Sequence, residues 1–124
     1  MKNKSFFTSF KYAIKGVKTV IKEERNFRFD LVMTLLVIVC SLVFPLLKWE
    51  RCLVYALCAL CLFAESTNSA IESLVDLASP GFHPLAGKAK DIAAGAALIC
   101  ALFSAIIGLY IFVPYGIDLL KSIF

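Results

Sequence analysis

The sequence predicts an all-α membrane protein in a single domain, residues 1–124, made of an N-terminal amphipathic surface helix followed by three transmembrane helices. The chain is 60% hydrophobic and has a mean hydropathy of +0.85, whereas about half of the residues in a soluble domain are apolar. Two stretches, 31–47 and 92–117, carry no charged residue, and the second is long enough to cross about 30 Å of hydrocarbon. Lipid is therefore the expected solvent for most of this chain.

Residues 1–28 are expected to form the surface helix and its junction with the first span. Apolar side chains recur at spacings of three and four along residues 5–22, with lysines at other positions around the turn, which is typical of a helix lying on a membrane. This segment holds eight of the 13 basic residues and two acids. A nucleic-acid-binding arm would carry similar charge, but beside membrane spans the pattern indicates the cytoplasmic side. We expect a cytoplasmic N-terminus and no nucleic-acid partner.

The three transmembrane helices are expected at 29–47, 52–78 and 92–117. The polar stretch 48–51 predicts a turn between the first two, and the stretch 79–91, which contains proline and glycine, predicts a loop. With the N-terminus in the cytoplasm, this loop also lies on the cytoplasmic side. Three helices barely enclose a polar interior of their own, so we expect the chain to form an oligomer.

The cysteines do not predict a redox or metal site. All five lie inside apolar runs, and Cys58 and Cys61 form a C-x-x-C, a spacing that suggests redox chemistry or zinc in a soluble protein. Neither a second pair nor a cluster of histidines accompanies it. We expect free thiols that act as small buried apolar side chains.

The second expected span carries four polar residues on one helix face. Glu65, Asn68, Glu72 and Asp76 follow one another at spacings of three and four, which places them within an arc of about 80° on a helix. Hydrogen bonding between helices would explain the asparagine, but an ionisable group inside a span costs a few kcal/mol and usually marks function. We expect functional roles for Glu65 and Glu72, whereas Asp76 has the alternative of capping the membrane interface.

The depth of these residues indicates where the site opens. Glu65 lies about 22 Å along the helix from the outer turn, and Glu72 lies two turns nearer the cytoplasm. The polar face therefore opens towards the cytosol and the inner leaflet. A glutamate at this depth suits a general base, and a carboxylate nearer the water suits Mg²⁺. Glu23 or Glu24 is a candidate for completing the metal site, unless both only balance nearby lysines.

The connection after this helix supplies further candidates. Lys90 is placed to neutralise a phosphate, and Asp91 begins the third span, where an acid is favourable at a helix N-terminus. His83, the one histidine of the chain, is equally compatible with an ordinary loop residue. The sequence has neither a G-x-x-x-x-G-K-[ST] phosphate loop nor a protein-kinase signature. A nucleotide site would therefore be built from helix faces and loops.

The polar motifs together resemble a known family. "ESTNSAIESLVD" followed by "HPLAGKAKDIAAGA" is similar to the signature E-x-x-N-x-A-I-E-x-x-x-D … H-x-x-x-x-x-A-K-D of the small prokaryotic diacylglycerol kinases, a family that includes the undecaprenol kinases of Gram-positive bacteria. With "KEERNFRFD" and "KYAIKG", the resemblance covers nearly the whole chain. It implies a homotrimer in the bacterial plasma membrane, with sites shared between subunits. The implied activity is phosphorylation of a lipid hydroxyl at the cytoplasmic face by ATP with Mg²⁺.

The resemblance also assigns roles by position. It implies that Glu65 is the general base, with Asn68 beside it, and that Glu72 and Glu24 hold Mg²⁺. The implied nucleotide-binding residues are Tyr12, Glu24, Glu72, His83, Lys90 and Asp91. The resemblance leaves the role of Asp76 open.

Two positions depart from the family pattern. Ser5 stands where some members have an arginine that reaches the phosphates, and Gly81 stands where others have a glutamate. Lys11 or Lys15 is a candidate for supplying the missing positive charge.

The lipid substrate and one other class of protein remain as alternatives. "EERNFRFD" and "KYAIKG" look more like the undecaprenol branch than the diacylglycerol branch, so we expect undecaprenol, with diacylglycerol as the alternative. A small oligomeric transporter or channel would use Glu65 as a proton or cation site. Such a pathway needs polar groups across the whole membrane, and the outer halves of the expected spans lack them. A structural or adaptor protein would leave the glutamates unexplained.

Overall fold

The computed structural model describes residues 5–124, and all regular secondary structure in that range is helical. Its four helices are α1 (Phe6–Glu23), α2 (Arg25–Val43), α3 (Lys48–Ala78) and α4 (Pro84–Ile123). The last three are long and apolar enough to cross a membrane. The predicted fold class, a short N-terminal helix followed by three apolar helices, is therefore confirmed. Lys2 and Lys4 of the predicted basic segment lie outside the described residues.

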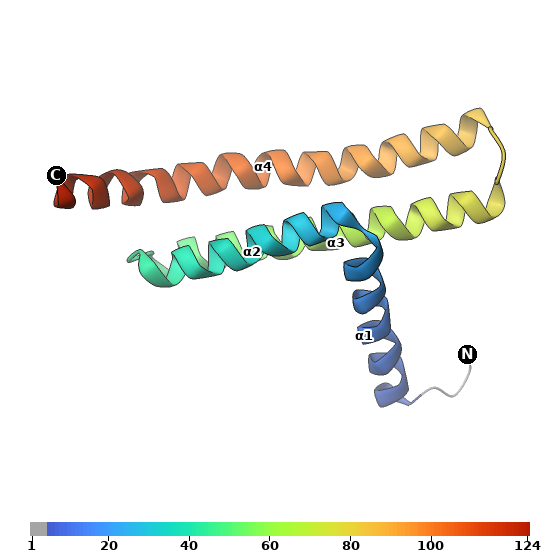
Figure 1. Cartoon of the computed structure of the whole chain (residues 1–124), viewed down its shortest axis with the longest axis horizontal. Coiled ribbons are helices and arrows are strands. Elements are labelled where there is room, and N and C mark those ends of the chain that lie inside the picture. Colours follow the sequence, from blue (N-terminus) through green and yellow to red (C-terminus); the bar gives the residue numbers. More distant parts are fainter. Residues whose placement is uncertain (1–4) are drawn as a thin grey trace.

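Helix α1 points away from the other three helices (Figure 1). Its N-cap is Ser5, whose Oγ accepts a hydrogen bond from the Thr8 backbone N–H at 3.2 Å, as a serine in this position usually does. The apolar side chains of Phe6, Phe7 and Phe10 are exposed, and Val20 near the C-terminal end is buried. The N-terminal part of α1 therefore presents an apolar surface, and its C-terminal end packs on the bundle.

Helices α3 and α4 form a long antiparallel hairpin, and α2 packs on α3 (Figure 1). Helix α4 has 40 residues and α3 has 31, which correspond to about 60 Å and 46 Å at 1.5 Å per residue. Both exceed the hydrocarbon thickness of about 30 Å. Each of these helices is therefore longer than a membrane span requires and extends beyond the hydrocarbon at one end or both.

Several predicted helix boundaries are wrong. Helix α2 begins at Arg25 and ends at Val43, before Pro45, because the residue preceding a proline disfavours helical backbone. The predicted turn at 48–51 is instead the first turn of α3. There Glu50 Oε1 accepts a hydrogen bond from the Leu47 backbone N–H at 2.9 Å and so caps the helix.

The second connection is also shorter than predicted. Helix α4 begins at Pro84 instead of after residue 91 and continues through Pro114. Proline is favoured in the first turn, where its missing N–H has no helical partner to lose. His83 Nδ1 accepts a hydrogen bond from the Leu85 N–H at 3.1 Å, which completes the helix start. Asp91 consequently lies two turns inside α4 instead of at its N-terminus.

The small hydrophobic core lies at the end of the bundle remote from the α3–α4 connection. It is centred on Leu46, Val54 and Ile111. Polar side chains join the helices at this end: Tyr115 Oη donates to Glu50 Oε1 at 2.5 Å, and an Arg51 amino group donates to the Ser41 carbonyl at 2.9 Å. These bonds fix this end of the bundle. The acidic face of α3, formed by Glu65, Asn68, Glu72 and Asp76, lies nearer the other end.

Most large apolar side chains of α2, α3 and α4 are exposed in the single chain. Such a surface suits helices surrounded by lipid or by other copies of the chain. The five cysteines are free thiols, as predicted. None of them is fully buried in the single chain, because the bundle is only a few helices wide, and Cys52 is exposed.

Candidate active site

The acidic face of α3 is half-buried between the helices. Glu65, Asn68 and Glu72 are half-buried, and Asp76, one turn further towards the α3–α4 connection, is exposed. Asn68 Nδ2 donates a hydrogen bond to Glu72 Oε1 at 3.3 Å, as residues four apart on a helix can. The structure therefore places three of the predicted residues together on one face.

Asn68 has an unsatisfied polar atom. Its Oδ1 is buried and accepts no hydrogen bond from any group within residues 5–124. A buried acceptor without a donor costs roughly 1–3 kcal/mol. Asn68 Oδ1 is therefore suited to accept a hydrogen bond from a bound molecule or from another copy of the chain.

Glu24 reaches this face from the corner between α1 and α2. It is the one residue between the two helices, and its backbone is extended, with φ −109° and ψ 112°. Its Oε1 accepts a hydrogen bond from Ser69 Oγ of α3 at 3.0 Å. Of the two glutamates that the sequence left as candidates, Glu24 joins the acidic face, whereas Glu23 is exposed and lines a neighbouring groove.

Carboxylates outnumber cationic side chains around Glu65. The charges of Asp30, Glu24 and Glu72 all act on Glu65. In the part of the chain that the structure describes, the one ion pair joins Lys90 to Asp76 at the open end of this face. Like charges at short range in an apolar setting repel strongly. The site therefore favours a bound cation.

The donor set fits Mg²⁺ held partly by a substrate. Within residues 5–124, no group of three acidic, histidine or cysteine side chains is arranged to hold a metal ion by itself. Magnesium keeps several of its water ligands and is commonly bound by one or two carboxylates plus substrate phosphates. Glu24 and Glu72 are the two carboxylates that would supply such a pair. Each has one oxygen fixed by a hydrogen bond, from Ser69 and from Asn68 respectively.

Lys90 lies at the open end of the acidic face. Its Nζ is 2.5 Å from Asp76 Oδ1, and the two side chains are 40% and 63% exposed. The charge of Glu72 also acts on Lys90. Asp91, the next residue, is exposed. The contact gives Asp76 a partner that the sequence did not assign to it: it holds the Lys90 ammonium beside the carboxylates.

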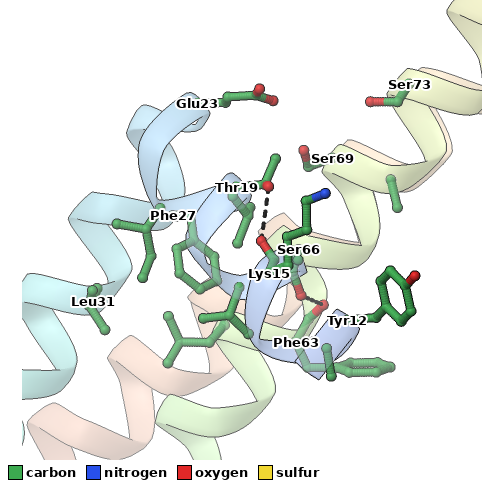
Figure 2. Close-up of a pocket in the computed structure, with 17 residues that line it drawn as sticks. Tyr12, Lys15, Thr19, Glu23, Phe27, Leu31, Phe63, Ser66, Ser69 and Ser73 are labelled. Atoms are coloured by element: carbon green, nitrogen blue, oxygen red, sulfur yellow. Dashed lines mark hydrogen bonds between the residues drawn. The ribbon is translucent and has the colours of Figure 1, made fainter. Parts of the chain in front are cut away.

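Tyr12 and His83 lie in other parts of the chain. His83 is exposed at the start of α4, where its ring caps the helix. Tyr12 of α1 lines a groove of about 830 Å³ between α1, the start of α2, and α3. Figure 2 shows this groove, with Phe27 and Leu31 of α2 and the serines of α3 among its walls. The groove is mainly apolar, and Ser69 joins it to Glu24.

Sequence reasoning missed Asp30 and the part played by Ser69. The predicted first span, 29–47, includes Asp30 near its start, but α2 begins at Arg25, so Asp30 lies in the second turn of the helix and is half-buried. An acid inside an apolar helix was the available signal. Ser69 adjoins the acidic face in the helical projection, but its bond to Glu24 joins residues 45 positions apart and has no local signal.

The fold and site define an integral membrane protein with an acidic site at one end of its helical bundle, and the comparisons identify its family. The family model described as "Prokaryotic diacylglycerol kinase" matches residues 11–112. An undecaprenol kinase of Bacillus subtilis is 40% identical over 109 residues, covering 88% of this chain and 89% of that protein.

Two diacylglycerol kinases give the same result. The Helicobacter pylori protein is 38% identical over 115 residues, with 90% of this chain and 88% of the relative covered. The Escherichia coli protein is 33% identical over 95 residues, with 77% and 78% covered. The chain belongs to the prokaryotic diacylglycerol kinase family. It is a lipid kinase, which is a transferase.

Proposed function

We propose that this kinase uses ATP and Mg²⁺ to phosphorylate the hydroxyl group of undecaprenol at the cytoplasmic face of a bacterial plasma membrane. The observation that carries the proposal is the convergence of Glu24 with the acidic face of α3 through Ser69. Undecaprenol is favoured by the 40% identity to an undecaprenol kinase, against 38% and 33% for two diacylglycerol kinases. Diacylglycerol is the alternative substrate.

Glu65 is the proposed general base, with Asn68 beside it. Glu65 lies deepest on the acidic face, where the hydroxyl of a lipid whose tail stays in the leaflet meets the site. It takes the hydroxyl proton while the lipid oxygen bonds to the γ-phosphorus and the bond to the leaving ADP breaks. Asn68 Oδ1, which is buried without a donor in residues 5–124, is placed to accept a hydrogen bond from the bound substrates.

Glu24 and Glu72 are the proposed Mg²⁺ ligands. Their hydrogen bonds to Ser69 and Asn68 orient the two carboxylates before the metal arrives. When bound, Mg²⁺ offsets the negative charge of the phosphates. Positioning of the reacting groups by the helices supplies the rest of the rate enhancement.

Lys90 and Asp91 are the proposed contacts for the phosphates and the nucleoside, with Tyr12 and His83 lining the nucleotide pocket. Lys90 already lies beside the carboxylates through Asp76. Tyr12 comes from α1 and His83 from the start of α4. We include in the proposal a homotrimer in which neighbouring subunits complete each site, because these elements are distributed along the chain and most of the apolar surface is exposed.

The groove between α1 and α3 is the proposed path for the lipid tail. Its walls are largely apolar, with Val17, Phe27, Leu31 and Phe63 among them, and an apolar wall suits a hydrocarbon chain. The eight basic residues near the N-terminus support a cytoplasmic N-terminus and attraction to anionic headgroups. The hydroxyl end of the lipid then meets ATP from the cytosol.

A competition assay tests the function. The full-length protein is incubated with γ-labelled ATP, Mg²⁺ and mixed micelles that contain equal amounts of undecaprenol and diacylglycerol. We expect most label in undecaprenyl phosphate, and labelled lipid lower by about 10²-fold or more with Glu65→Gln. Preferential labelling of phosphatidic acid would assign the alternative substrate, and no labelled lipid would refute the proposal.

A further inference from the structure

The corner between α1 and α2 determines where Glu24 points. Glu24 is the one non-helical residue between the two helices, and the chain changes direction sharply there (Figure 1). The direction of its side chain therefore depends on the angle between α1 and α2. A small change in that angle would move the carboxylate away from Ser69.

Arg28 joins the two sides of this corner. Its NH1 group donates hydrogen bonds to the Ile21 carbonyl at 2.9 Å and to the Lys22 carbonyl at 2.8 Å. These carbonyls belong to the last turn of α1, where backbone acceptors lose their helical partners. A cationic side chain there also interacts favourably with the helix dipole. Because Arg28 lies in the first turn of α2, it fastens the end of α1 to the start of α2.

The other contacts at the corner do not fix its angle as strictly. Val20 and Phe27 are buried on the two sides of the corner, and Phe27 lines the groove (Figure 2). Apolar packing has little directional preference, whereas hydrogen bonds from a planar guanidinium do. The backbone bond from the Arg28 N–H to the Glu24 carbonyl, 3.1 Å, starts α2 but does not reach α1.

We propose that Arg28 is a positioning residue that clamps the α1–α2 corner and so holds the Glu24 carboxylate against Ser69, where it serves the metal site with Glu72. The part that concerns the metal rests on the proposed function. Arg28 acts through Glu24 in this inference and contacts neither ATP nor lipid. Its loss therefore raises the Mg²⁺ requirement and leaves the affinity for the nucleotide itself nearly unchanged.

The test compares Arg28→Gln with Arg25→Gln in the full-length protein in lipid nanodiscs. Arg25 is a matched control, because it lies one turn away in the same helix, is exposed, and its side chain forms no hydrogen bond or ion pair within residues 5–124. Hydrogen–deuterium exchange is measured at the amides of residues 22–28. We expect Arg28→Gln to speed this exchange about tenfold, as a locally opened corner should, and Arg25→Gln to leave it unchanged.

Kinetics give the second readout. In Arg28→Gln we expect the Mg²⁺ concentration for half-maximal activity to rise about tenfold, which is the size of effect expected when a charge-assisted hydrogen bond is lost. The KM for ATP at saturating Mg²⁺ should stay within about twofold of the wild-type value. Arg28→Lys keeps a cationic donor with a shorter reach. Arg28→Lys should give an exchange rate and a Mg²⁺ requirement between those of the wild-type protein and Arg28→Gln. If Arg28→Gln does not fold, Arg28→Lys is compared with the wild-type protein instead.

Three outcomes would overturn the inference. Wild-type exchange in both Arg28 variants would show that Arg28 does not clamp the corner. Faster exchange with an unchanged Mg²⁺ requirement would show that the corner does not position Glu24 for the metal. A raised KM for ATP with unchanged exchange would show that the guanidinium binds phosphates directly. An inactive wild-type protein would instead refute the proposed function, and the exchange data would still decide whether Arg28 is the clamp.

Discussion

Replacing Ser69 by alanine tests the contact on which the proposed site depends. The Ser69 hydroxyl donates the hydrogen bond that ties Glu24 to α3. Ser69→Ala removes this donor, and the small side chain leaves the helix otherwise intact. We expect lower activity and a higher Mg²⁺ requirement, because the Glu24 carboxylate loses its fixed orientation.

The expected magnitude follows from the chemistry of the bond. Hydrogen bonds to charged groups contribute about 1.5–3 kcal/mol, and both side chains here are only half-buried, so the lower value applies. Since about 1.4 kcal/mol corresponds to a factor of ten, kcat/KM at limiting Mg²⁺ should fall about tenfold. Ser69→Thr, which keeps the hydroxyl, should recover most of the loss.

Ser66→Ala is the matched control for this experiment. Ser66 lines the same groove, nearly one turn earlier on α3, and its hydroxyl donates to the Phe63 carbonyl of its own helix at 3.0 Å. Phosphate transfer to lipid from labelled ATP is measured across a Mg²⁺ titration for each variant. Wild-type kinetics in Ser69→Ala, or an equal loss in Ser66→Ala, would refute the proposed link between Ser69, Glu24 and the metal.

Three further substitutions probe the rest of the site. Glu65→Gln should lower kcat by about 10²-fold or more, as expected for loss of a general base, while ATP binding measured by calorimetry persists; normal turnover would remove Glu65 from that role. Glu72→Ala should raise the Mg²⁺ concentration needed for half-maximal activity, and an unchanged titration would contradict its place as a ligand. Asp76→Asn should raise the KM for ATP by up to about fivefold, because an exposed ion pair is worth about 1 kcal/mol or less and Lys90 loses the partner that holds it beside the carboxylates; an unchanged or lowered KM would mean that Asp76 does not position Lys90.

The helical periodicity of the sequence was enough to predict the acidic face. Glu65, Asn68 and Glu72 are only a few residues apart, and their relative directions depend on the helix alone. The apolar content likewise predicted three long helices, which the structure confirms. These are local properties, and the geometry of a single helix determines them.

Helix boundaries were predicted less well, because charged residues and prolines occur both in loops and in the first turn of a helix. The stretch 48–51 was expected to form a turn on account of its charges, although Glu50 in the first turn of α3 caps the helix at Leu47. Pro84 was assigned to a loop, although proline is favoured at a helix start. In both cases a single side-chain contact decides which interpretation holds.

Contacts between distant segments could not be predicted from periodicity. The Ser69–Glu24 bond and the Lys90–Asp76 ion pair depend on how α1, α3 and α4 pack. The resemblance to a family suggested Glu24 and Lys90 as site residues, but it left the role of Asp76 open and gave no partner for either. Arg28 and Asp30 gained significance only when the true start of α2 placed them at the corner and beside the acidic face.

The position of a bound metal would show whether the acids of α3 are tolerated because they serve a nucleotide-bound cation. Crystals of the full-length protein with Mn²⁺ and a non-hydrolysable ATP analogue would show the metal by anomalous scattering. We expect one peak or more within bonding distance of Glu24 and Glu72, with Lys90 directed at the phosphates. Manganese and triphosphate bound away from these carboxylates would contradict this expectation.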